Sequence, residues 1–510
     1  MAQYILSANE MQDCDNRTMT EHGIPSLVLM ERAAMKVVEA IGEEYPEAYK
    51  FAVVCGPGNN GGDGVAIARL LQLKGFRVRC FTLGNPDKYT DQLKQEIAIA
   101  ESYGLTMENT FDETAIAQAN ITIDAMFGIG LTRGLAGDYE NAAVIINENA
   151  NKVVAVDIPS GYDANCGKLL GNTGIKADLT VTFAYMKKGL VMSECKSATG
   201  KITTADVGIY LDEPKDKYDI IIDDTILSKI KPRPIDANKG SCGKLLVIAG
   251  SENIYGACYL SAKAALSSGA GLVKIYTHKN NTESIRQNLP EAMFLGYNEY
   301  NEDELLAQLK WADTILIGPG LGMDEVSTDI FKKTIETVTK PIIIDADGIN
   351  LAAASLPLLK QAAARTTVIL TPHLKEMERL TGTKVADINI NQEQVAKDFA
   401  LEYGLVVVLK NHTTIATDGN RASYIISGNQ ALATPGSGDV LAGLVASLIG
   451  QDALEIEKPL AETGECTIEK ALLTASAAAY IHGKAGQKAS TIYGIRGVLA
   501  SHIIDNFEKI

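Results

Sequence analysis

Residues 434–444 of the chain, with the sequence TPGSGDVLAGL, combine residue types that phosphoryl-transfer chemistry needs at close spacing. Glycines before a helix let its first backbone N–H groups turn toward one point, where the helix dipole adds partial positive charge. Asp439 directly follows Gly436, Ser437 and Gly438, so its carboxylate would lie beside a bound anion and could orient an attacking hydroxyl. The alternative is an ordinary glycine-rich loop with an acidic first helical turn, because such short motifs often arise by chance.

A second glycine-rich stretch, FAVVCGPGNNGGDGVAIARLL at residues 51–71, predicts a strand, a loop with five glycines and a helix. This arrangement holds phosphates or nucleotides in parallel sheets. The loop matches neither the dinucleotide fingerprint nor a Walker A motif, because no Lys-Ser/Thr pair follows it. A purely structural turn has no need of Asn59, Asn60 and Asp63 together, so we interpret the loop as functional.

The elements that must position these loops alternate between strand and helix. The first half predicts a helix over 9–42, capped by Asn9 and broken at Pro25, a helix over 92–103, and strands at 78–83, 121–125 and 153–156. Asp124 and Asp157 end two of these strands. Ligands bind beyond the carboxyl ends of parallel strands, so we expect both aspartates to meet the glycine loop in one pocket. A single aspartate at a strand end is equally typical of a turn.

The second half repeats this pattern, with a small-residue helix at 261–271 that must pack closely on a neighbour. Strand ends place four further polar residues beside Asp439, namely Asp345, Asp347, His373 and Lys410. His373 has two interpretations, a site residue or a structural hydrogen-bonding group. The two aspartates at 345 and 347 are equally consistent with an outer shell around Mg²⁺ and with a simple turn.

The whole chain narrows the class of protein. A length of 510 residues predicts two to four domains, and a net charge of −16 argues against nucleic acid or an acidic membrane as the main partner. Eight scattered cysteines without a CxxC pair indicate a reducing compartment. An early charge argues against a signal peptide, and no apolar stretch suggests a membrane span. We therefore expect a cytoplasmic enzyme, with a linker at 213–222 between domains 1–212 and 223–510.

The ordered motifs of the second half resemble a known family. AGS (249–251), YGA (255–257), GPGLG (318–322), DADGINL (345–351), TPH (371–373) and TPGSGDVLAG (434–443) are similar to the ADP/ATP-dependent NAD(P)H-hydrate dehydratases of the ribokinase-like superfamily. GPGNNGGDG, DAMFGIGLTRGL and VDIPSGYDANCG of the first half resemble the NAD(P)H-hydrate epimerase domain. The fused order matches the bifunctional bacterial repair enzymes. The resemblance implies an α/β protein, a Rossmann-like three-layer αβα domain followed by a ribokinase-like α/β domain.

For the second domain, the resemblance implies transfer of a phosphoryl group from ADP or ATP, with Mg²⁺, to the ring hydroxyl of a hydrated NADH or NADPH. Phosphate then leaves, and the reduced cofactor is restored. Asp439 would orient or deprotonate the hydroxyl. The implied hydrate-binding residues are Ala257, Gly320, His373 and Asp439, and the implied nucleotide-binding residues are Lys410, Asn411, His412, Thr413, Thr414 and Gly438.

For the first domain, the resemblance implies interconversion of the R and S hydrates, with Asp157 as the acid/base group. A K⁺ ion is implied at Asn60, Asp124 and Ser160, whose oxygen atoms suit a hard cation. The implied substrate-binding residues are Asn59, Asn60, Gly61, Gly62, Asp63, Gly128, Ile129, Gly130, Leu131, Thr132, Arg133, Gly134, Tyr139 and Asp157.

Some positions depart from the family pattern. Lys375, Asn411, His412 and Pro435 stand where the family usually has glycine or small residues, which leaves contacts in the substrate and nucleotide loops open. Two alternatives to the repair function also remain: a ribokinase-like small-molecule kinase, and a non-catalytic nucleotide-sensing first domain. The donor, ADP or ATP, and the preferred hydrate cannot be read from the residues, and we expect a homo-oligomer by resemblance alone.

Overall fold

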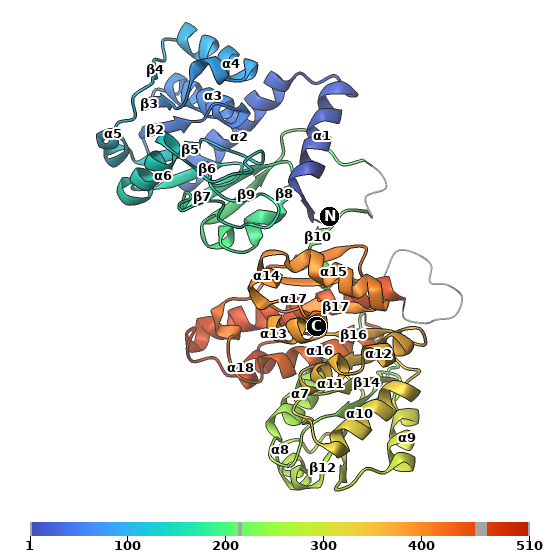
Figure 1. Ribbon diagram of the computed structural model, residues 1–510. Coiled ribbons are helices and arrows are strands. Elements are labelled where there is room, and N and C mark those ends of the chain that lie inside the picture. The colour runs from blue at the N-terminus through green and yellow to red at the C-terminus, as the bar shows by residue number, and fades with distance from the viewer. Residues whose placement is uncertain (1–2, 213–216, 454–466, 508–510) are drawn as a thin grey trace. The chain divides into compact units, whose positions relative to one another are not determined.

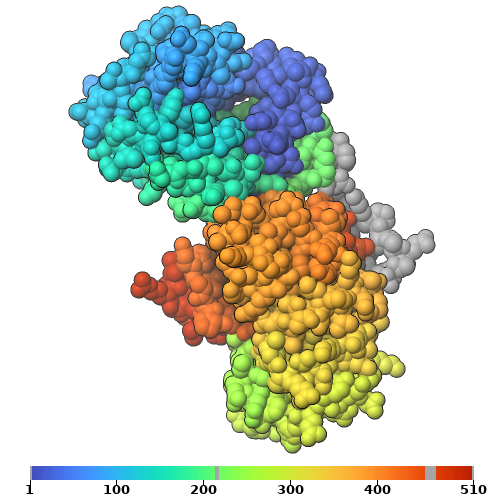
Figure 2. Space-filling view, in the orientation of Figure 1, coloured from blue at the N-terminus to red at the C-terminus, as the bar shows by residue number. Residues whose placement is uncertain are grey.

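The computed structural model describes residues 3–212, 217–453 and 467–507, which belong to two compact units (Figure 1). The first unit comprises Tyr4–Tyr218, and the second comprises Asp219–Ile510 together with Met1–Gln3. In the space-filling view the first unit is coloured from blue to green and the second from green to red (Figure 2). No helix within the described residues is both long enough and apolar enough to cross a membrane.

A seven-stranded sheet, parallel throughout, forms the centre of the first unit, with the strand order β4-β3-β2-β5-β6-β7-β9. Because all strands run the same way, the loops after β2, β5 and β6 leave the sheet at one edge. The strands are β2 (Lys50–Cys55), β3 (Arg77–Thr82), β4 (Met107–Glu108), β5 (Ile121–Ala125), β6 (Val153–Val156), β7 (Leu179–Phe183) and β9 (Lys201–Ala205).

The described residues of the first unit form six α-helices: α1 (Ala8–Thr20), α2 (Ser26–Glu44), α3 (Asn59–Leu73), α4 (Asp91–Ser102), α5 (Glu113–Gln118) and α6 (Asp138–Asn149). The helix expected over 9–42 is thus two helices, with the break next to Pro25. The expected cap at Asn9 is wrong. Ser7 caps α1 because its hydroxyl accepts the N–H of Glu10, while the Glu10 carboxylate accepts the N–H of Ser7 at 2.8 Å.

Outside the central sheet, β1 (Gln3–Leu6) pairs in parallel with β8 (Met186–Lys187). In this register Leu6 lies opposite Lys187, and α1 begins two residues after Leu6. Both strands are buried at these positions. The pairing therefore determines where α1 lies with respect to Lys187.

The second unit has a sheet in which the strands follow the order β13-β12-β11-β14-β15-β16-β17-β18-β19-β10. Pairs from β13 to β17 are parallel, β18 is antiparallel to both neighbours, and β10 is parallel to β19. The strands are β10 (Ile220–Ile221), β11 (Lys244–Ile248), β12 (Leu272–His278), β13 (Met293–Tyr297), β14 (Thr314–Ile317), β15 (Ile342–Ile344), β16 (Val368–Leu370), β17 (Val406–Leu409), β18 (Thr414–Thr417) and β19 (Ala422–Ile425).

Helices of the second unit include α16 (Ser437–Gly450), which is buried along nearly its whole length. It packs against α7 and α17, and a Cβ at Gly443 would lie 2.1 Å from the Ser261 carbonyl oxygen. The predicted close packing of the small-residue helix is confirmed, although that helix, α7, spans Gly256–Ser267. The others are α8 (Thr282–Asn288), α9 (Glu302–Trp311), α10 (Glu325–Thr337), α11 (Asp347–Ala353), α12 (Leu356–Ala363), α13 (Leu374–Thr381), α14 (Val385–Ile390), α15 (Gln392–Tyr403), α17 (Ile468–Tyr493) and α18 (Ala500–Asp505).

The end of the expected linker, 213–222, is structured. Ile220 and Ile221 form β10, and Ile222 is buried in the core of the second unit. Asp219 is also buried, and Lys397 donates to its carboxylate at 2.9 Å. The apolar residues 220–222 add a strand to the edge of the sheet at β19, so they belong to the second unit. The charged residues before them had suggested a linker that continues to residue 222. Residues 213–216 lie outside the described residues, and the other domain bounds remain a prediction.

Candidate active sites

A cavity of about 150 Å³ lies in the first unit at the edge of the sheet where the β6 strand ends. It contains Asn59, Asp63, Ile129 and Asp157 from the predicted set, so the glycine loop and the aspartate after β6 do meet. The expectation of one pocket holds for Asp157 and the glycine loop, whereas Asp124 does not line this cavity. Its other lining residues are Met11, Asp15, Met19, Ser26, Leu29, Met30, Ala33, Phe183, Lys187, Val207 and Ile209.

Asp157 has a backbone φ of 70°, a left-handed conformation that few residues other than glycine adopt. Lys187 Nζ donates to Asp157 Oδ1 at 2.6 Å, and the Thr182 hydroxyl donates to the same oxygen at 3.2 Å. The other oxygen, Oδ2, is 3.3 Å from the position that a Cβ would take at Gly128. Asp157 is therefore held through one oxygen, which leaves the second available to a ligand.

Lys187 was missed by the sequence reasoning. Its side chain is 1% exposed, and its ammonium group also donates to Thr182 Oγ1 at 2.9 Å and to the Phe183 carbonyl at 2.7 Å. A lysine just after the apolar strand β7 was the available signal, since lysine is rarely buried without a carboxylate partner. Nothing in the sequence, however, indicated which carboxylate it would meet.

Asp124 and Ser160, two of the predicted K⁺ ligands, are in contact. The Ser160 hydroxyl donates to Asp124 Oδ1 at 2.7 Å, and the Ser160 N–H donates to Oδ2 at 2.8 Å. Burial raises the pKa of Asp124 to about 6, against the lowering effect of these Ser160 hydrogen bonds. The third predicted ligand, Asn60, is 9% exposed, and its amide nitrogen has no partner within the described residues.

The predicted substrate loops of the first unit differ in how they approach this site. A Cβ at Gly128 would be 3.4 Å from Asn60 Oδ1 and 3.3 Å from Asp157 Oδ2, so there is little space between Gly128 and these two side chains. Gly61 lies against the Gly56 carbonyl, where a Cβ would come within 2.0 Å, which requires glycine for the turn itself. Tyr139 packs edge-on against Phe127 with ring centroids 4.9 Å apart. The loop is therefore packed around its glycines before any ligand binds.

Asp439 is the third residue of α16 in the second unit, and Gly436 before the helix has a φ of 85°. The helix thus begins with Ser437, whose N–H donates to the Thr434 carbonyl at 3.2 Å, and the partial positive charge of the helix start lies beside Asp439. Burial raises the pKa of Asp439 to about 7, assisted by the negative charge of Asp345 and opposed by Lys410. A carboxyl that titrates near neutral pH suits an acid/base role.

Lys410 connects the strand ends to this loop. Its ammonium group donates to Asp345 Oδ1 at 2.9 Å, and the Thr371 hydroxyl donates to the same oxygen at 2.7 Å. A Cβ at Gly438 would be only 3.3 Å from Lys410 Nζ. Burial alone would lower the pKa of Lys410, but Asp345 and Glu376 raise it above its usual value, so the lysine stays charged. A cation therefore lies next to the predicted anion site.

His373 caps helix α13, and its Nδ1 accepts the backbone N–H groups of Lys375 and Glu376, each at 3.0 Å. Its Nε2 is 3.3 Å from the buried carboxylate of Glu376, while half of the side chain is exposed. Both interpretations of His373 therefore have support: one ring nitrogen is structural, and the exposed part of the ring can meet a ligand. Burial lowers the pKa of His373, which favours the neutral ring.

Ala257 and Gly320 lie together, as expected for one binding surface, because a Cβ at Gly320 would be 3.0 Å from the Ala257 methyl group. The φ of Gly320 is 61°. Nearby, Asp347 Oδ2 accepts the N–H of Gly322 at 2.9 Å, while its Oδ1 accepts from Asn350 at 3.3 Å. These hydrogen bonds give Asp347 a structural role in the turn that follows strand β15.

The predicted nucleotide residues after Lys410 are partly structural. Asn411 Nδ2 donates to Gln392 Oε1 at 3.1 Å, and Gln392 Nε2 donates to the Thr413 carbonyl at 2.8 Å. Thr413 is fully buried, so its side chain does not face a ligand, whereas His412 is exposed. The Thr414 hydroxyl is 3.5 Å from the Asn411 carbonyl. Asn411 thus has a physical reason to depart from a small residue, since it ties this loop to α15.

His482, a histidine of the second unit, belongs to none of the predicted sites. It is buried on α17, and its Nε2 lies 3.1 Å from the hydroxyl of Ser437, the first residue of α16. Burial lowers the pKa of His482 to about 4, so the ring is neutral. Sequence spacing could not reveal this pair, because the two residues lie on different helices.

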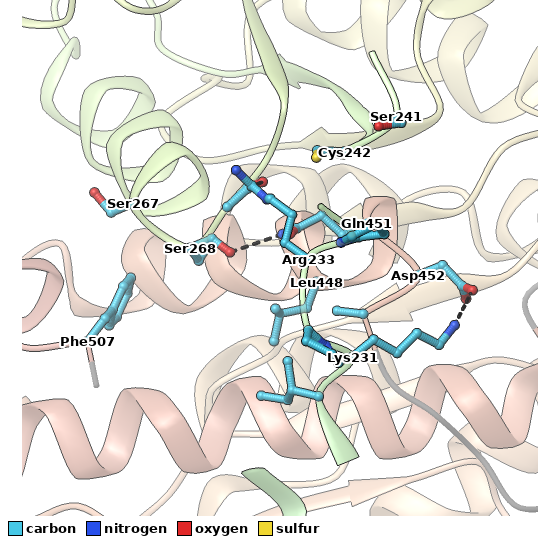
Figure 3. Close-up of a pocket in the computed structure, with 15 residues that line it drawn as sticks. Lys231, Arg233, Ser241, Cys242, Ser267, Ser268, Leu448, Gln451, Asp452 and Phe507 are labelled. Atoms are coloured by element: carbon cyan, nitrogen blue, oxygen red, sulfur yellow. Dashed lines mark hydrogen bonds and ion pairs between the residues drawn. The ribbon is translucent and has the colours of Figure 1, made fainter. Parts of the chain in front are cut away.

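A larger cavity, of about 820 Å³, lies elsewhere in the second unit (Figure 3). It adjoins Leu448, which is about 14 Å along α16 from Asp439 at the usual rise per residue. None of the predicted site residues lines it. Lys231 pairs with Asp452 at 2.8 Å, and Gln451 donates to the Ser268 carbonyl at 3.0 Å, as Figure 3 shows. Its polar groups are thus largely paired with one another.

Among the described residues, no group of three or more His, Cys, Asp or Glu side chains is arranged to hold a metal ion. The predicted K⁺ site is of another kind, with one carboxylate, one hydroxyl and one amide. Asp124, Ser160 and Asn60 fit a hard monovalent cation in donor chemistry, because all three present oxygen. The unpartnered atom of Asn60 is its amide nitrogen, a donor for an acceptor atom of a ligand, whereas Oδ1 is the atom that would meet a cation.

Two family models match the chain. Residues 245–509 match the model described as NAD(P)H-hydrate dehydratase, and residues 26–189 match the YjeF-related protein N-terminus. The bifunctional NAD(P)H-hydrate repair enzyme Nnr of Moorella thermoacetica is 33% identical over 98% of this chain and 95% of its own length. The enzyme of the same name from Escherichia coli K12 is 31% identical over 96% and 90%.

Among solved structures, the ADP/ATP-dependent NAD(P)H-hydrate dehydratase of Bacillus subtilis, co-crystallised with ATP/Mg²⁺, is 26% identical with a TM-score of 0.44. It covers 55% of this chain and 93% of its own. The two family models and the near full-length relatives confirm the predicted family and its fused order. The predicted fold class, a Rossmann-like unit followed by a ribokinase-like unit, is confirmed with it. The chain therefore belongs to the family of bifunctional NAD(P)H-hydrate repair enzymes.

Proposed function

We propose that the second unit dehydrates the S hydrate of NADH or NADPH at the expense of ADP or ATP, and that the first unit interconverts the R and S hydrates. The observation that carries this proposal is the position of Asp439 in the glycine-rich first turn of α16, close to the Lys410 ammonium group, where burial raises its pKa to about 7. This combination places an acid/base group and an anion site together.

In the dehydratase unit, Asp439 takes the proton of the ring hydroxyl as its oxygen attacks the terminal phosphoryl group of the nucleotide. Hydroxide is a poor leaving group, whereas phosphate leaves readily when the ring nitrogen supplies its electron pair. The backbone N–H groups of Gly436 and Gly438 and the charge of Lys410 stabilise the phosphoryl oxygens. Mg²⁺, bound with the nucleotide, would supply further positive charge.

The nucleotide would lie along residues 410–414 and Gly438, and the hydrate along Ala257, Gly320 and the exposed part of His373. Support comes from the close approach of Lys410 to Gly438 and of Gly320 to Ala257. Because the Thr413 side chain is buried, contact at that position would use the backbone.

In the epimerase unit, Asp157 assists the loss and return of the hydroxyl through its free Oδ2 atom. Lys187 holds Oδ1, and the surrounding wall is mainly apolar. Asn60, Asp124 and Ser160 would hold K⁺, which would supply a fixed positive charge close to the substrate phosphates. Asn59, Asp63 and Ile129 line the cavity and would contact the substrate there.

The test is recovery of reduced cofactor from a mixture of R and S hydrates, followed by its absorbance, with Mg²⁺, K⁺ and either ADP or ATP. Complete recovery with one nucleotide supports both activities and identifies the donor. Recovery that stops once the S form is consumed would remove the epimerase. A stable phosphoester in place of reduced cofactor and free phosphate would instead identify a small-molecule kinase. We also propose that the enzyme is cytoplasmic and that it forms a homo-oligomer.

A further inference from the structure

Three carboxyl groups and one ammonium group line the cavity of the first unit. They are Asp15, Asp63, Asp157 and Lys187, and they come from four different segments of the chain. Lys187 is committed to Asp157 through a 2.6 Å contact. The carboxyl groups of Asp15 and Asp63 make no hydrogen bond or ion pair with any described residue. The cavity therefore has one balanced charge pair and two carboxyls whose polar partners must come from a ligand or water.

Asp15 lies on a face of α1 that is otherwise apolar. Met11 and Met19 are four residues before and after it, so all three project from the same side of the helix, and all three line the cavity. A carboxyl between two methionines costs free energy if it serves packing alone, because it gains no hydrogen bond there. Its position on the cavity wall points to a functional use.

The pairing of β1 with β8 fixes the position of helix α1 within the first unit. Strand β1 runs directly into α1, and its pairing with β8 puts Leu6 opposite Lys187. The element that carries Asp15 is thereby tied to the element that holds Asp157. Asp15 approaches the cavity from α1, whereas Asp157 approaches from the end of β6, so a ligand between them would have a carboxyl from each of two elements.

We propose that Asp15 is a second catalytic acid/base residue of the epimerase, acting on the substrate together with Asp157. The proposal rests on the proposed epimerase function of the first unit. Epimerisation moves a hydroxyl from one face of the ring to the other, so proton donation is required on one face and proton removal on the other. One carboxyl cannot face both sides of a bound ring.

In one direction, Asp15 donates its proton to the leaving hydroxyl on ring carbon 6 (C6). The C6–O bond breaks with its electron pair on oxygen, and water departs. The ring nitrogen's electron pair forms a double bond to C6. Water from the solvent then adds to C6 from the other face, the electron pair returns to nitrogen, and Asp157 Oδ2 takes the surplus proton. The net result is inversion and one proton moved from Asp15 to Asp157. Exchange with solvent restores both carboxyls.

The charges around Asp15 suit this assignment better than those around Asp63. Burial raises the pKa of Asp15 to about 6, opposed by Lys187 and assisted by Asp157, so Asp15 both holds and releases a proton near neutral pH. Burial raises the pKa of Asp63 well above its usual value, with Asp157 and Glu96 adding to the effect. We therefore assign the proton transfer to Asp15.

The experiment compares Asp15→Asn with Asp13→Asn, which removes an exposed carboxyl from the same helix. Wild-type epimerase activity is measured first, because its absence would refute the proposed function and not this inference. With wild-type activity present, Asp15→Asn should lower kcat for R-to-S conversion by about 10²-fold or more, with a much smaller change in KM. Asp13→Asn should match the wild type, and the dehydratase activity of all three proteins should be equal.

The pH profile separates catalysis from structure. The charged groups that line the cavity with Asp15 are Asp63, Asp157 and Lys187. Wild-type kcat/KM should fall as pH rises through about 6, because Asp15 loses the proton it donates. The variant Asp15→Glu should recover part of the rate and keep this limb, whereas Asp15→Asn should lose it. Near wild-type kcat in a folded Asp15→Asn protein, or an unchanged pH profile, would overturn the assignment.

Discussion

The hydroxyl of Ser437 lies 3.1 Å from Nε2 of His482, and the pair joins the start of α16 to the middle of α17. Both residues are buried. The Ser437 N–H donates to the Thr434 carbonyl at 3.2 Å, so Ser437 fixes the first turn of α16 and does not itself offer an amide to an anion. We therefore propose that His482 is a positioning residue, which acts on the start of α16 through Ser437.

Replacing His482 with Ala should lower dehydratase kcat by about 10-fold to 100-fold, because small displacements of positioned groups are costly in rate. His482→Gln keeps a hydrogen-bonding group and should recover part of the loss. The measurement is kcat and KM for the S hydrate, with epimerase activity of the same protein as an internal control. If His482→Ala acted only by destabilising the second unit, His482→Gln would lose activity as well. A lowered thermal transition temperature of the variants would then show the destabilisation.

Asp439→Asn should lower dehydratase kcat by at least about 10²-fold while leaving epimerisation intact. Thermal stability should be retained or raised, because burial and Asp345 both disfavour the ionised carboxyl in the folded protein. Single-turnover release of phosphate and a thermal melt would measure the two effects. Near wild-type phosphate release from the folded variant would exclude Asp439 as the acid/base group.

The dehydratase should lose activity as the pH falls through about 7, the value to which burial raises the pKa of Asp439. The sign follows from the role: only the ionised carboxyl can accept the proton of the ring hydroxyl. The check is kcat/KM for the S hydrate between about pH 5 and 9, the range in which such carboxyl and histidine groups titrate. His482, with its pKa lowered to about 4, should not contribute to this limb.

Lys187→Met should remove epimerase activity and destabilise the first unit by about 3 kcal/mol, because a buried carboxylate loses its charged partner. Adding Asp157→Asn to Lys187→Met should recover much of that stability without restoring activity, since the uncompensated charge is gone. Denaturant unfolding of the wild type, both single variants and the double variant forms the necessary cycle. Additive losses in the double variant would mean that the 2.6 Å contact contributes little.

Replacement of K⁺ by Na⁺ in the assay should slow epimerisation and leave dehydration unchanged, because the proposed ligands Asn60, Asp124 and Ser160 all belong to the first unit. Ser160→Ala should raise the K⁺ concentration needed for half-maximal rate, since it removes one oxygen and the hydrogen bond to Asp124. Titration of the rate with K⁺ is the measurement. Equal rates in both salts would argue against a cation at these residues.

Local sequence signals predicted much of this protein. The glycine loop at 56–64 and the motif ending in Asp439 were recognisable because backbone conformation and helix polarity depend on neighbouring residues. Strands β5 and β6 were predicted with the bounds they have in the structure, since each is a short apolar run followed by polar residues. The rule that ligands bind at the carboxyl ends of parallel strands then placed Asp157 beside Asn59 and Asp63.

Tertiary structure alone decided which distant side chains meet. Lys187 and Asp157 are 30 residues apart in the chain and meet only in the folded first unit, and Asp15 reaches the same cavity from α1, which follows β1. His482 contacts Ser437 through helix packing. The sequence determined the loops and strand ends that carry the chemistry, because those depend on local conformation. The structure decided their partners and their ionisation, because burial and charge depend on neighbours far along the chain.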